Sequence, residues 1–202
     1  MLFRSRAIVL DGTTADDPNA GYLDAVAGHL PHQIERPDFR GVSDAILEIG
    51  RELASRIEEG RVDGPTILLM VHGLQRFRVL RRSEDDFGFS TDEGPPTPDK
   101  VFGEILREGP EHGVHVVLWA DTVATFERCV DRQGMRAIDQ KAMFQVGATD
   151  SSTLIDSPAA STLGPNRGLL YNEERGTIEK FRPWGLPSEA YLVAAGRALA
   201  GR

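Results

Sequence analysis

Short runs of apolar residues alternate with segments in which apolar residues are spaced along one helical face. The runs at 7–10, 66–71 and 114–119 are rich in Val, Ile and Leu and have the length of buried β-strands. Between them, 42–59 carries apolar residues every three or four positions, which predicts an amphipathic helix. Its inner face would consist of Val42, Ile46, Ile49, Leu53 and Ile57. Continuous apolar strands separated by helices predict an α/β fold with a parallel sheet buried on both faces.

The later part of the chain predicts two further features. Residues 142–146 form another apolar run, which we expect to be a fourth strand of the sheet. The segments 168–171 and 177–181 flank a polar turn, a pattern typical of a β-hairpin. We expect a single domain over 1–202, whose parts are the parallel sheet, 7–146, and a C-terminal extension that contains the hairpin, 147–202.

Polar and small residues directly follow the apolar runs. In parallel sheets of this kind, ligands bind at the carboxyl ends of the strands. The residues at these ends are Asp11, His72, Gly73, Asp121 and Thr122. We therefore expect any small-molecule site to lie among them. One open alternative is a small α/β enzyme that uses Asp11 or His72 in its chemistry.

Composition excludes several classes of protein. A content of 40% hydrophobic and 27% charged residues is that of a globular chain and not of a disordered one. No apolar run approaches the roughly 20 residues that a membrane helix needs, so we expect no membrane contact from this segment. The single cysteine, Cys129, excludes an internal disulfide and fits a reducing cytoplasm. A cytoplasmic location is the expectation.

The distribution of charge singles out one basic cluster. A net charge of −8 argues against broad, non-specific DNA binding, because phosphate contacts need clustered Lys and Arg. The cluster consists of Arg76, Arg78, Arg81 and Arg82, directly after the strand at 66–71. An acidic segment rich in Gly and Pro, 83–98, follows it and is expected to be a mobile loop. The cluster is either a solvated helix face or a contact surface for DNA or a partner.

Two pairs of histidines have spacings that invite comparison with metal sites. They are His29 with His32 and His112 with His115. Pro31 breaks the helical geometry of the first pair. The second pair enters a strand, where residues three apart point to opposite faces. No cysteine pair supports either, so we expect no metal site.

The last third of the chain resembles a known family. Residues 142–171 are similar to the C-terminal part of the motor domain of FtsK/SpoIIIE-type ATPases, in the HerA/FtsK superfamily of P-loop ATPases. The matching positions are Asp150, Ser151, Thr153, Asp156, Leu163, Gly164, Leu170 and Tyr171. Upstream, 113–120 resembles the sensor strand of the family, and 66–73 falls where the family has its Walker B strand.

The resemblance implies a RecA-like parallel sheet that is incomplete in this chain. No Gly-x-x-x-x-Gly-Lys-Ser/Thr phosphate loop occurs in the sequence, so the phosphate-loop strand would be absent. ATP and Mg²⁺ are expected for the complete module and neither for this chain alone. The residues nearest the nucleotide would be Asp11, His72 and Thr122. The expected partners are further copies in a homo-oligomeric ring or the missing N-terminal half, together with double-stranded DNA.

Several positions depart from the family pattern. His72 and Gly73 stand where the family has Asp-Glu, the pair that holds Mg²⁺ and activates water. Asp121 and Thr122 replace a Thr-Gln pair at the sensor position, and Lys141 stands where many members carry Arg. No catalytic residue is therefore assigned with confidence from the motif. The candidates for contact with a neighbouring subunit are Arg132, Arg136 and Lys141.

The predicted function follows from the resemblance and its departures. The chain is expected to be the C-terminal portion of an FtsK-like, ATP-driven DNA translocase module. Its ATP binding would depend on an upstream phosphate loop, and the chain alone is predicted to be inactive. The alternative is a nucleotide-free structural or docking domain of a secretion or defence complex, which the loss of the Asp-Glu pair favours.

Overall fold

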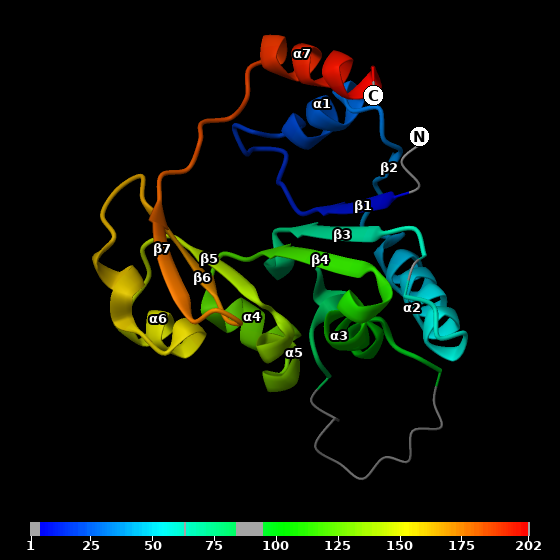
Figure 1. The fold of residues 1–202 in the computed structure, drawn as a ribbon, viewed down its shortest axis with the longest axis horizontal. Helices are drawn as coiled ribbons and strands as arrows, with labels where there is room; N and C mark the ends of the chain where they lie inside the picture. The colour runs from blue at the N-terminus through cyan, green and yellow to red at the C-terminus, as the bar shows by residue number, and fades with distance from the viewer. Residues whose placement is uncertain (1–4, 63, 84–94, 202) are drawn as a thin grey trace. The chain divides into compact units, whose positions relative to one another are not determined.

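The computed structural model describes residues 5–62, 64–83 and 95–201 (Figure 1). The chain divides into two compact units, one made of 1–134 with 188–202 and the other of 135–187. Each is described below by itself. Most of the acidic segment that the sequence predicts as a mobile loop, 83–98, lies outside the described residues.

The first unit contains a parallel sheet and most of the helices. In chain order its elements are β1 (Arg6–Asp11), α1 (Tyr22–His29), β2 (Ile34–Glu35), α2 (Val42–Glu58), β3 (Ile67–His72), the 3₁₀ turns η1 (Leu74–Arg76) and η2 (Arg78–Leu80), α3 (Pro98–Glu108), η4 (Pro110–His112), β4 (Val114–Trp119), α4 (Val123–Cys129) and α7 (Glu189–Ala200). Helix α5 (Arg132–Ala137) crosses the boundary to the second unit. The sequence prediction of an α/β fold with a helix-flanked parallel sheet is confirmed.

The sheet has the strand order β2-β1-β3-β4, and every neighbouring pair is parallel. Strand β4 is therefore an edge strand among the described residues. Helices α2 and α3 pack against each other on one side of this sheet (Figure 1). Residues Ile67, Leu69 and Val71 of β3 are buried, while the residues between them are only half-buried. This alternation differs from the burial on both faces that the continuous apolar run predicted.

Helix α2 shows both the strength and the limit of the periodicity argument. Its first four predicted inner residues, from Val42 to Leu53, are buried. The last, Ile57, is 45% exposed, and its neighbour Arg56 is buried instead. The reason is that the guanidinium of Arg56 finds hydrogen-bond acceptors in the loops before β3 and β4. The hydrogen bonds to these acceptors favour burial of Arg56 over burial of the neighbouring apolar side chain of Ile57.

The second unit is an antiparallel sheet with a small core of its own. Its elements are β5 (Gln140–Met143), α6 (Ala148–Ile155), η5 (Pro158–Thr162), β6 (Gly168–Asn172) and β7 (Thr177–Phe181). The strand order is β5-β6-β7, and the predicted hairpin is present as β6 and β7. The core consists of Met143, Ile155, Ala160, Leu163 and Leu169.

The strand expected at 142–146 differs from its prediction in position and partner. It lies at Gln140–Met143 and pairs antiparallel with β6 instead of joining the parallel sheet. Lys141 lies opposite Tyr171 and forms an ion pair with Glu173, which fixes this register. An apolar run indicates that a strand forms but does not indicate its neighbour, and only Met143 of the four residues is buried.

Candidate functional site at the carboxyl ends of the strands

The parallel sheet brings three side chains to one row at the ends of neighbouring strands. Asp11 at the end of β1 lies opposite His72 of β3, and His72 lies opposite Trp119 of β4. The sequence prediction placed Asp11 and His72 near a common edge, and the structure does bring them together. Trp119 was not among the predicted site residues, although its position as the last residue of an apolar strand was a usable signal.

A short network of hydrogen bonds joins Asp11 to His72 through Thr13. The backbone N–H and the hydroxyl of Thr13 both donate to Asp11 Oδ1, at 2.9 and 2.5 Å. The same hydroxyl oxygen lies 3.2 Å from His72 Nδ1. Since the hydroxyl proton is directed to the carboxylate, Nδ1 of His72 is the donor in this contact, which leaves Nε2 as the acceptor nitrogen.

The other oxygen of Asp11 is held by an arginine. Arg36, in the segment between β2 and α2, donates from Nη2 to Asp11 Oδ2 at 3.0 Å and also pairs with Asp24. Burial alone would raise the pKa of Asp11. The hydrogen bonds from Thr13 and the positive charge of Arg36 outweigh burial, so the pKa of Asp11 is lower than its ordinary value. Asp11 is therefore a carboxylate whose two oxygens are already engaged.

Two glycines allow the backbones of β1 and β3 to approach at this edge. Gly12 N–H donates to His72 O at 2.7 Å, and a Cβ at Gly12 would lie 2.6 Å from that oxygen. Gly73 has a φ of +79°, in the left-handed region that favours glycine. The backbone conformation and close packing at His72-Gly73 are therefore a structural reason for glycine at positions 12 and 73.

The imidazole of His72 also packs on an aromatic ring. Its ring is stacked on that of Trp119, with centroids 4.9 Å apart and an interplanar angle of 20°. Both side chains are partly exposed. The row Asp11, His72 and Trp119 can thus offer one proton-accepting nitrogen beside an aromatic face. In the part of the chain that the structure describes, no group of three or more His, Cys, Asp or Glu residues is arranged to hold a metal ion.

The sensor residues predicted from the sequence engage each other at the start of α4. The backbone N–H of Thr125 donates to Thr122 Oγ1 at 3.2 Å, so Thr122 caps this helix. The Thr125 hydroxyl donates to Asp121 Oδ1 at 2.8 Å. These contacts are local, and no hydrogen bond among the described residues joins Asp121 or Thr122 to Asp11 or His72.

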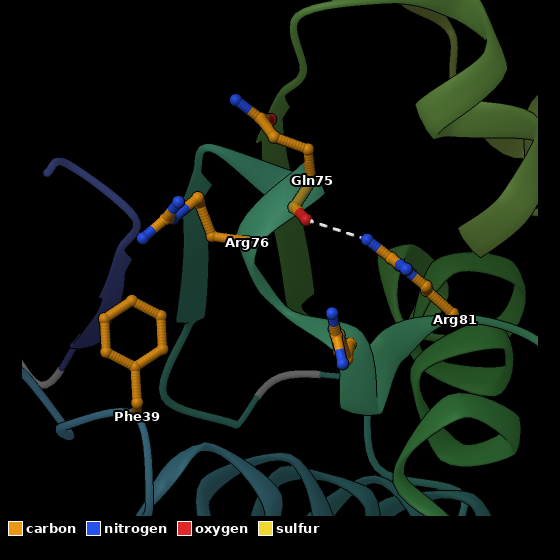
Figure 2. Close-up of a pocket in the computed structure, with 5 residues that line it drawn as sticks. Phe39, Gln75, Arg76 and Arg81 are labelled. Carbon is orange, nitrogen blue, oxygen red and sulfur yellow. Dashed lines mark hydrogen bonds between the residues drawn. The ribbon is translucent and has the colours of Figure 1, made fainter.

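The basic cluster forms a cavity of about 420 Å³ at the surface of the first unit (Figure 2). Its lining consists of Phe39, Gln75, Arg76, Arg78 and Arg81. Nη2 of Arg81 donates to the backbone oxygen of Gln75 at 3.1 Å, which orients that guanidinium. Arg82, the fourth member of the predicted cluster, does not line the cavity, and its backbone N–H donates to Arg128 O.

Phe39 is a cavity residue that the sequence did not reveal. It lies in the segment before α2, and its ring is 55% exposed. Its centroid is 5.3 Å from that of the buried Phe77, at an interplanar angle of 27°. Phe39 also lines a second cavity, of about 290 Å³, together with Asp11, Asp24 and Arg36. Nothing in the sequence around Phe39 indicates this placement, since it depends on contact with η1 and η2.

The predicted contacts with a neighbouring subunit are spread over two elements. Arg132 and Arg136 lie on α5, whereas Lys141 lies on β5. The Lys141 ammonium pairs with Glu173 and lies 5.5 Å from the centre of the Tyr171 ring. Lys141 is thus engaged within its own sheet.

Comparison with solved structures gives the class of this fold. No family model and no curated protein matches the chain. The fold is similar to that of solved viral genome-packaging NTPases. Within the described residues no helix is long and apolar enough to cross a membrane.

Several of the similar structures are of B204 from two related viruses. The DNA-packaging ATPase B204 from Sulfolobus turreted icosahedral virus has a TM-score of 0.58 at 14% identity, and the match covers 90% of this chain and 83% of that one. B204 from Sulfolobus turreted icosahedral virus 2 in complex with AMPPCP has a TM-score of 0.54 at 13% identity, and the match covers 90% of this chain and 84% of that one. The complex of the same protein with ATP-gammaS has a TM-score of 0.50 at 14% identity, and the match covers 89% of this chain and 82% of that one. At these identities the likeness concerns the fold alone.

Proposed function

We propose that this chain is the C-terminal portion of an FtsK-like, ATP-driven DNA translocase module whose phosphate loop lies in a segment outside it. The observation that carries the proposal is the position of β4 at the edge of the sheet. In the family that the sequence resembles, the phosphate-loop strand pairs with the sensor strand, to which β4 corresponds. The side of β4 away from β3 pairs with no described strand, so it is available for a strand of that kind.

Exposure of β4 supports the same proposal. Val114 is buried, whereas Val117 and Trp119, on the opposite face of the strand, are 51% and 47% exposed. In a parallel sheet that is complete, a central strand is covered on both faces. Addition of a neighbouring strand and its connecting helix would cover these residues.

The residues present do not by themselves form a complete site for Mg²⁺-ATP. The chain has no glycine-rich phosphate loop. Asp11, the carboxylate nearest the strand ends, already binds Thr13 and Arg36, and His72 and Gly73 occupy the positions of the Asp-Glu pair. In the complete module, Asp11, His72 and Thr122 would lie near the nucleotide without supplying its phosphate contacts.

The similar solved structures support nucleotide binding and DNA handling as the general class of activity that we propose for this chain. B204 is described as a genome-packaging NTPase and was solved with AMPPCP and ATP-gammaS. By extension we propose a homo-oligomeric ring, with Arg76, Arg78, Arg81 and Arg82 contacting double-stranded DNA or a neighbouring subunit. Arg132, Arg136 and Lys141 are further candidates for the subunit contact.

The test is to restore the upstream coding segment. We expect the reading frame before Met1 to encode a glycine-rich loop that ends in Lys-Thr, and the extended protein to bind ATP. The same extended protein with the loop lysine changed to alanine is the control and should lose binding. An upstream segment without such a loop would contradict the proposal.

A nucleotide-free structural or docking domain is the second candidate. It is favoured by the loss of the Asp-Glu pair and by the packing of Gly12 against the His72-Gly73 backbone, which gives that dipeptide a structural role. An extended protein that stays folded and monodisperse, binds a protein partner and ignores ATP would decide for this candidate.

A further inference from the structure

We infer that the arginine cavity binds unpaired nucleotides of a single-stranded nucleic acid, with phosphates on the arginines and a base on Phe39. The inference rests on the proposed function for the class of ligand, a nucleic acid, and replaces the duplex at this cavity with a single strand. It requires neither ATP binding nor a second subunit. Every residue that it uses lies in the first unit.

The charge of the cavity selects for an anion. Three of its five lining residues are arginines, and none is an acid. None of the ion pairs between described residues involves Arg78 or Arg81, and the carboxylate of Asp16 lies close enough to Arg76 for the two charges to interact. The planar guanidinium group matches the geometry of phosphate oxygens and can bind them through two donors. A cavity of about 420 Å³ is also within the size range of small-ligand sites, roughly 300–1,000 Å³.

Phe39 distinguishes a nucleotide from other anions. Its ring is more than half exposed, yet it is held in place by stacking on Phe77. An exposed and fixed aromatic ring beside guanidinium groups is the arrangement on which unpaired bases stack in single-strand-binding proteins. Acidic peptides would use the arginines without needing this ring. Duplex DNA would also use the arginines, but its bases are stacked on one another and are not available to Phe39.

The neighbouring cavity gives the ligand a direction. On its side of Phe39, the lining includes Asp11, Asp24 and Asp38 and one arginine, Arg36, which is already paired with Asp11 and Asp24. This side repels phosphate. A bound single-stranded nucleic acid would therefore place its phosphates over Arg76, Arg78 and Arg81. One of its bases would stack on Phe39, which lies between the arginine cavity and the acidic cavity.

The net charge of −8 bears on the expected strength of binding. Because acids outnumber bases over the whole chain, 31 Asp and Glu against 23 Lys and Arg, binding should be confined to this cavity and depend modestly on salt. Three phosphates neutralised on a single strand give a slope of about −2 for the logarithm of the binding constant against the logarithm of salt concentration. Removal of one arginine should bring the slope to about −1.4.

The experiment measures the fluorescence anisotropy of a labelled 12-nucleotide oligothymidylate titrated with the complete chain. Phe39→Ala should weaken binding by roughly 5- to 150-fold, the range found when a stacking residue is removed. Phe39→Tyr should retain binding, because it keeps the ring. Arg78→Gln should weaken binding and lower the salt slope. The control Arg51→Gln removes the same charge from an exposed position on α2 and should leave both unchanged. Circular dichroism establishes that each variant is folded.

Three results would overturn the inference. One is no binding of the oligothymidylate. Another is equal binding of a duplex of the same length with no effect of Phe39→Ala, which would leave the duplex contact of the proposed function intact. The third is equal competition by polyglutamate, which would indicate a protein partner. None of these results depends on ATP, so a failure here is distinguishable from a failure of the proposed nucleotide site.

Discussion

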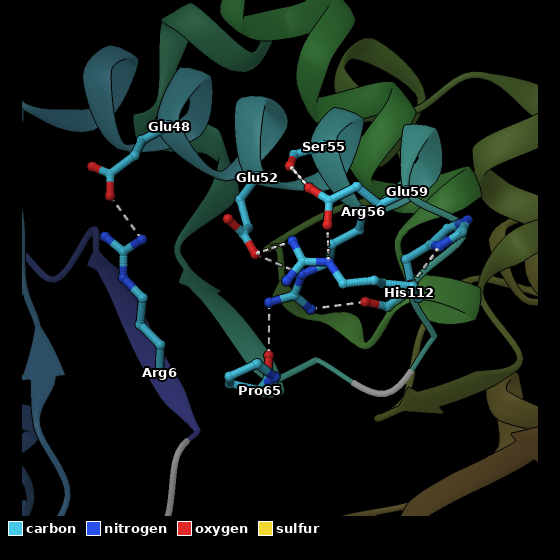
Figure 3. Close-up of polar contacts among 9 residues, drawn as sticks. Arg6, Glu48, Glu52, Ser55, Arg56, Glu59, Pro65 and His112 are labelled. Carbon is cyan, nitrogen blue, oxygen red and sulfur yellow. Dashed lines mark hydrogen bonds and ion pairs between the residues drawn. The ribbon is translucent and has the colours of Figure 1, made fainter.

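Arg56→Met should cause a large loss of stability, because this arginine connects α2 to the starts of two strands. Its side chain is 2% exposed. Nε donates to Glu52 Oε1, Nη1 to the backbone oxygen of His112 and Nη2 to that of Pro65, each at 2.8 Å (Figure 3). Pro65 lies just before β3 and His112 just before β4. The arginine therefore helps to align the two strands whose ends carry His72 and Trp119.

The magnitude follows from the groups left without a partner. Methionine keeps the apolar stem of the side chain but removes all the donors, so two backbone carbonyl groups lose their hydrogen bonds. Each unsatisfied buried group costs about 1–3 kcal/mol. Glu52 is 39% exposed and can be solvated by water, so its loss adds little. Two such groups would cost about 2–6 kcal/mol. Because Pro65 is an exposed residue and both hydrogen bonds are only partly buried, we expect the free energy of unfolding to fall by the lower part of this range, about 2–4 kcal/mol.

Urea unfolding followed by far-ultraviolet circular dichroism measures this change. The midpoint should fall while the slope with urea stays the same, since the surface exposed on unfolding does not change. Arg51→Met, one turn earlier on the exposed face of α2, is the matched control and should change stability by less than about 0.5 kcal/mol. A change this small for Arg56→Met would refute the reasoning, because it would mean that water replaces the guanidinium.

Two further changes test the edge of the sheet that carries Asp11 and His72. Gly73→Ala should destabilise the fold by about 1–2 kcal/mol, measured by the same urea titration, because its φ of +79° is unfavourable for a residue with a Cβ; an unchanged midpoint would contradict this. Because the pKa of Asp11 is lowered by folding, its contribution to stability is complete above the unfolded value of about 3.9 and is lost as the pH falls through the folded value. The stability difference between the wild type and Asp11→Asn, measured by unfolding at a series of pH values, should therefore shrink as the pH falls below about 4, and a difference that grows instead would exclude the Thr13 and Arg36 contacts as its source.

The sequence predicted those features that depend on local pattern. Strands β1, β3 and β4 and most of the inner face of α2 follow from apolar runs and from apolar periodicity. The proximity of Asp11 and His72 follows from parallel pairing, since the carboxyl ends of parallel strands meet at one edge.

Features that depend on contacts between residues far apart in the chain could not be predicted from the sequence. Arg56 is buried in place of Ile57 because its guanidinium donates hydrogen bonds to two backbone oxygens. These oxygens lie nine and 56 positions away in the chain, so the local pattern does not reveal them. A strand forms near the predicted segment, at Gln140–Met143 instead of 142–146, but its pairing with β6 is decided by long-range contacts that an apolar run does not encode. Phe39 joins the arginine cavity only because Phe77 provides a surface for it. Each is a case in which tertiary contacts override or complete the local pattern.

The central claim is that this chain carries the strands of an ATPase core without the part that holds the phosphates. Its most direct test is the turnover of ATP by the 202-residue chain alone, measured as phosphate release in the presence of Mg²⁺ and with and without DNA. We expect no release above that of a sample without protein, because neither the phosphate loop nor the Asp-Glu pair is present. Sustained hydrolysis that co-purifies with the chain would contradict the claim.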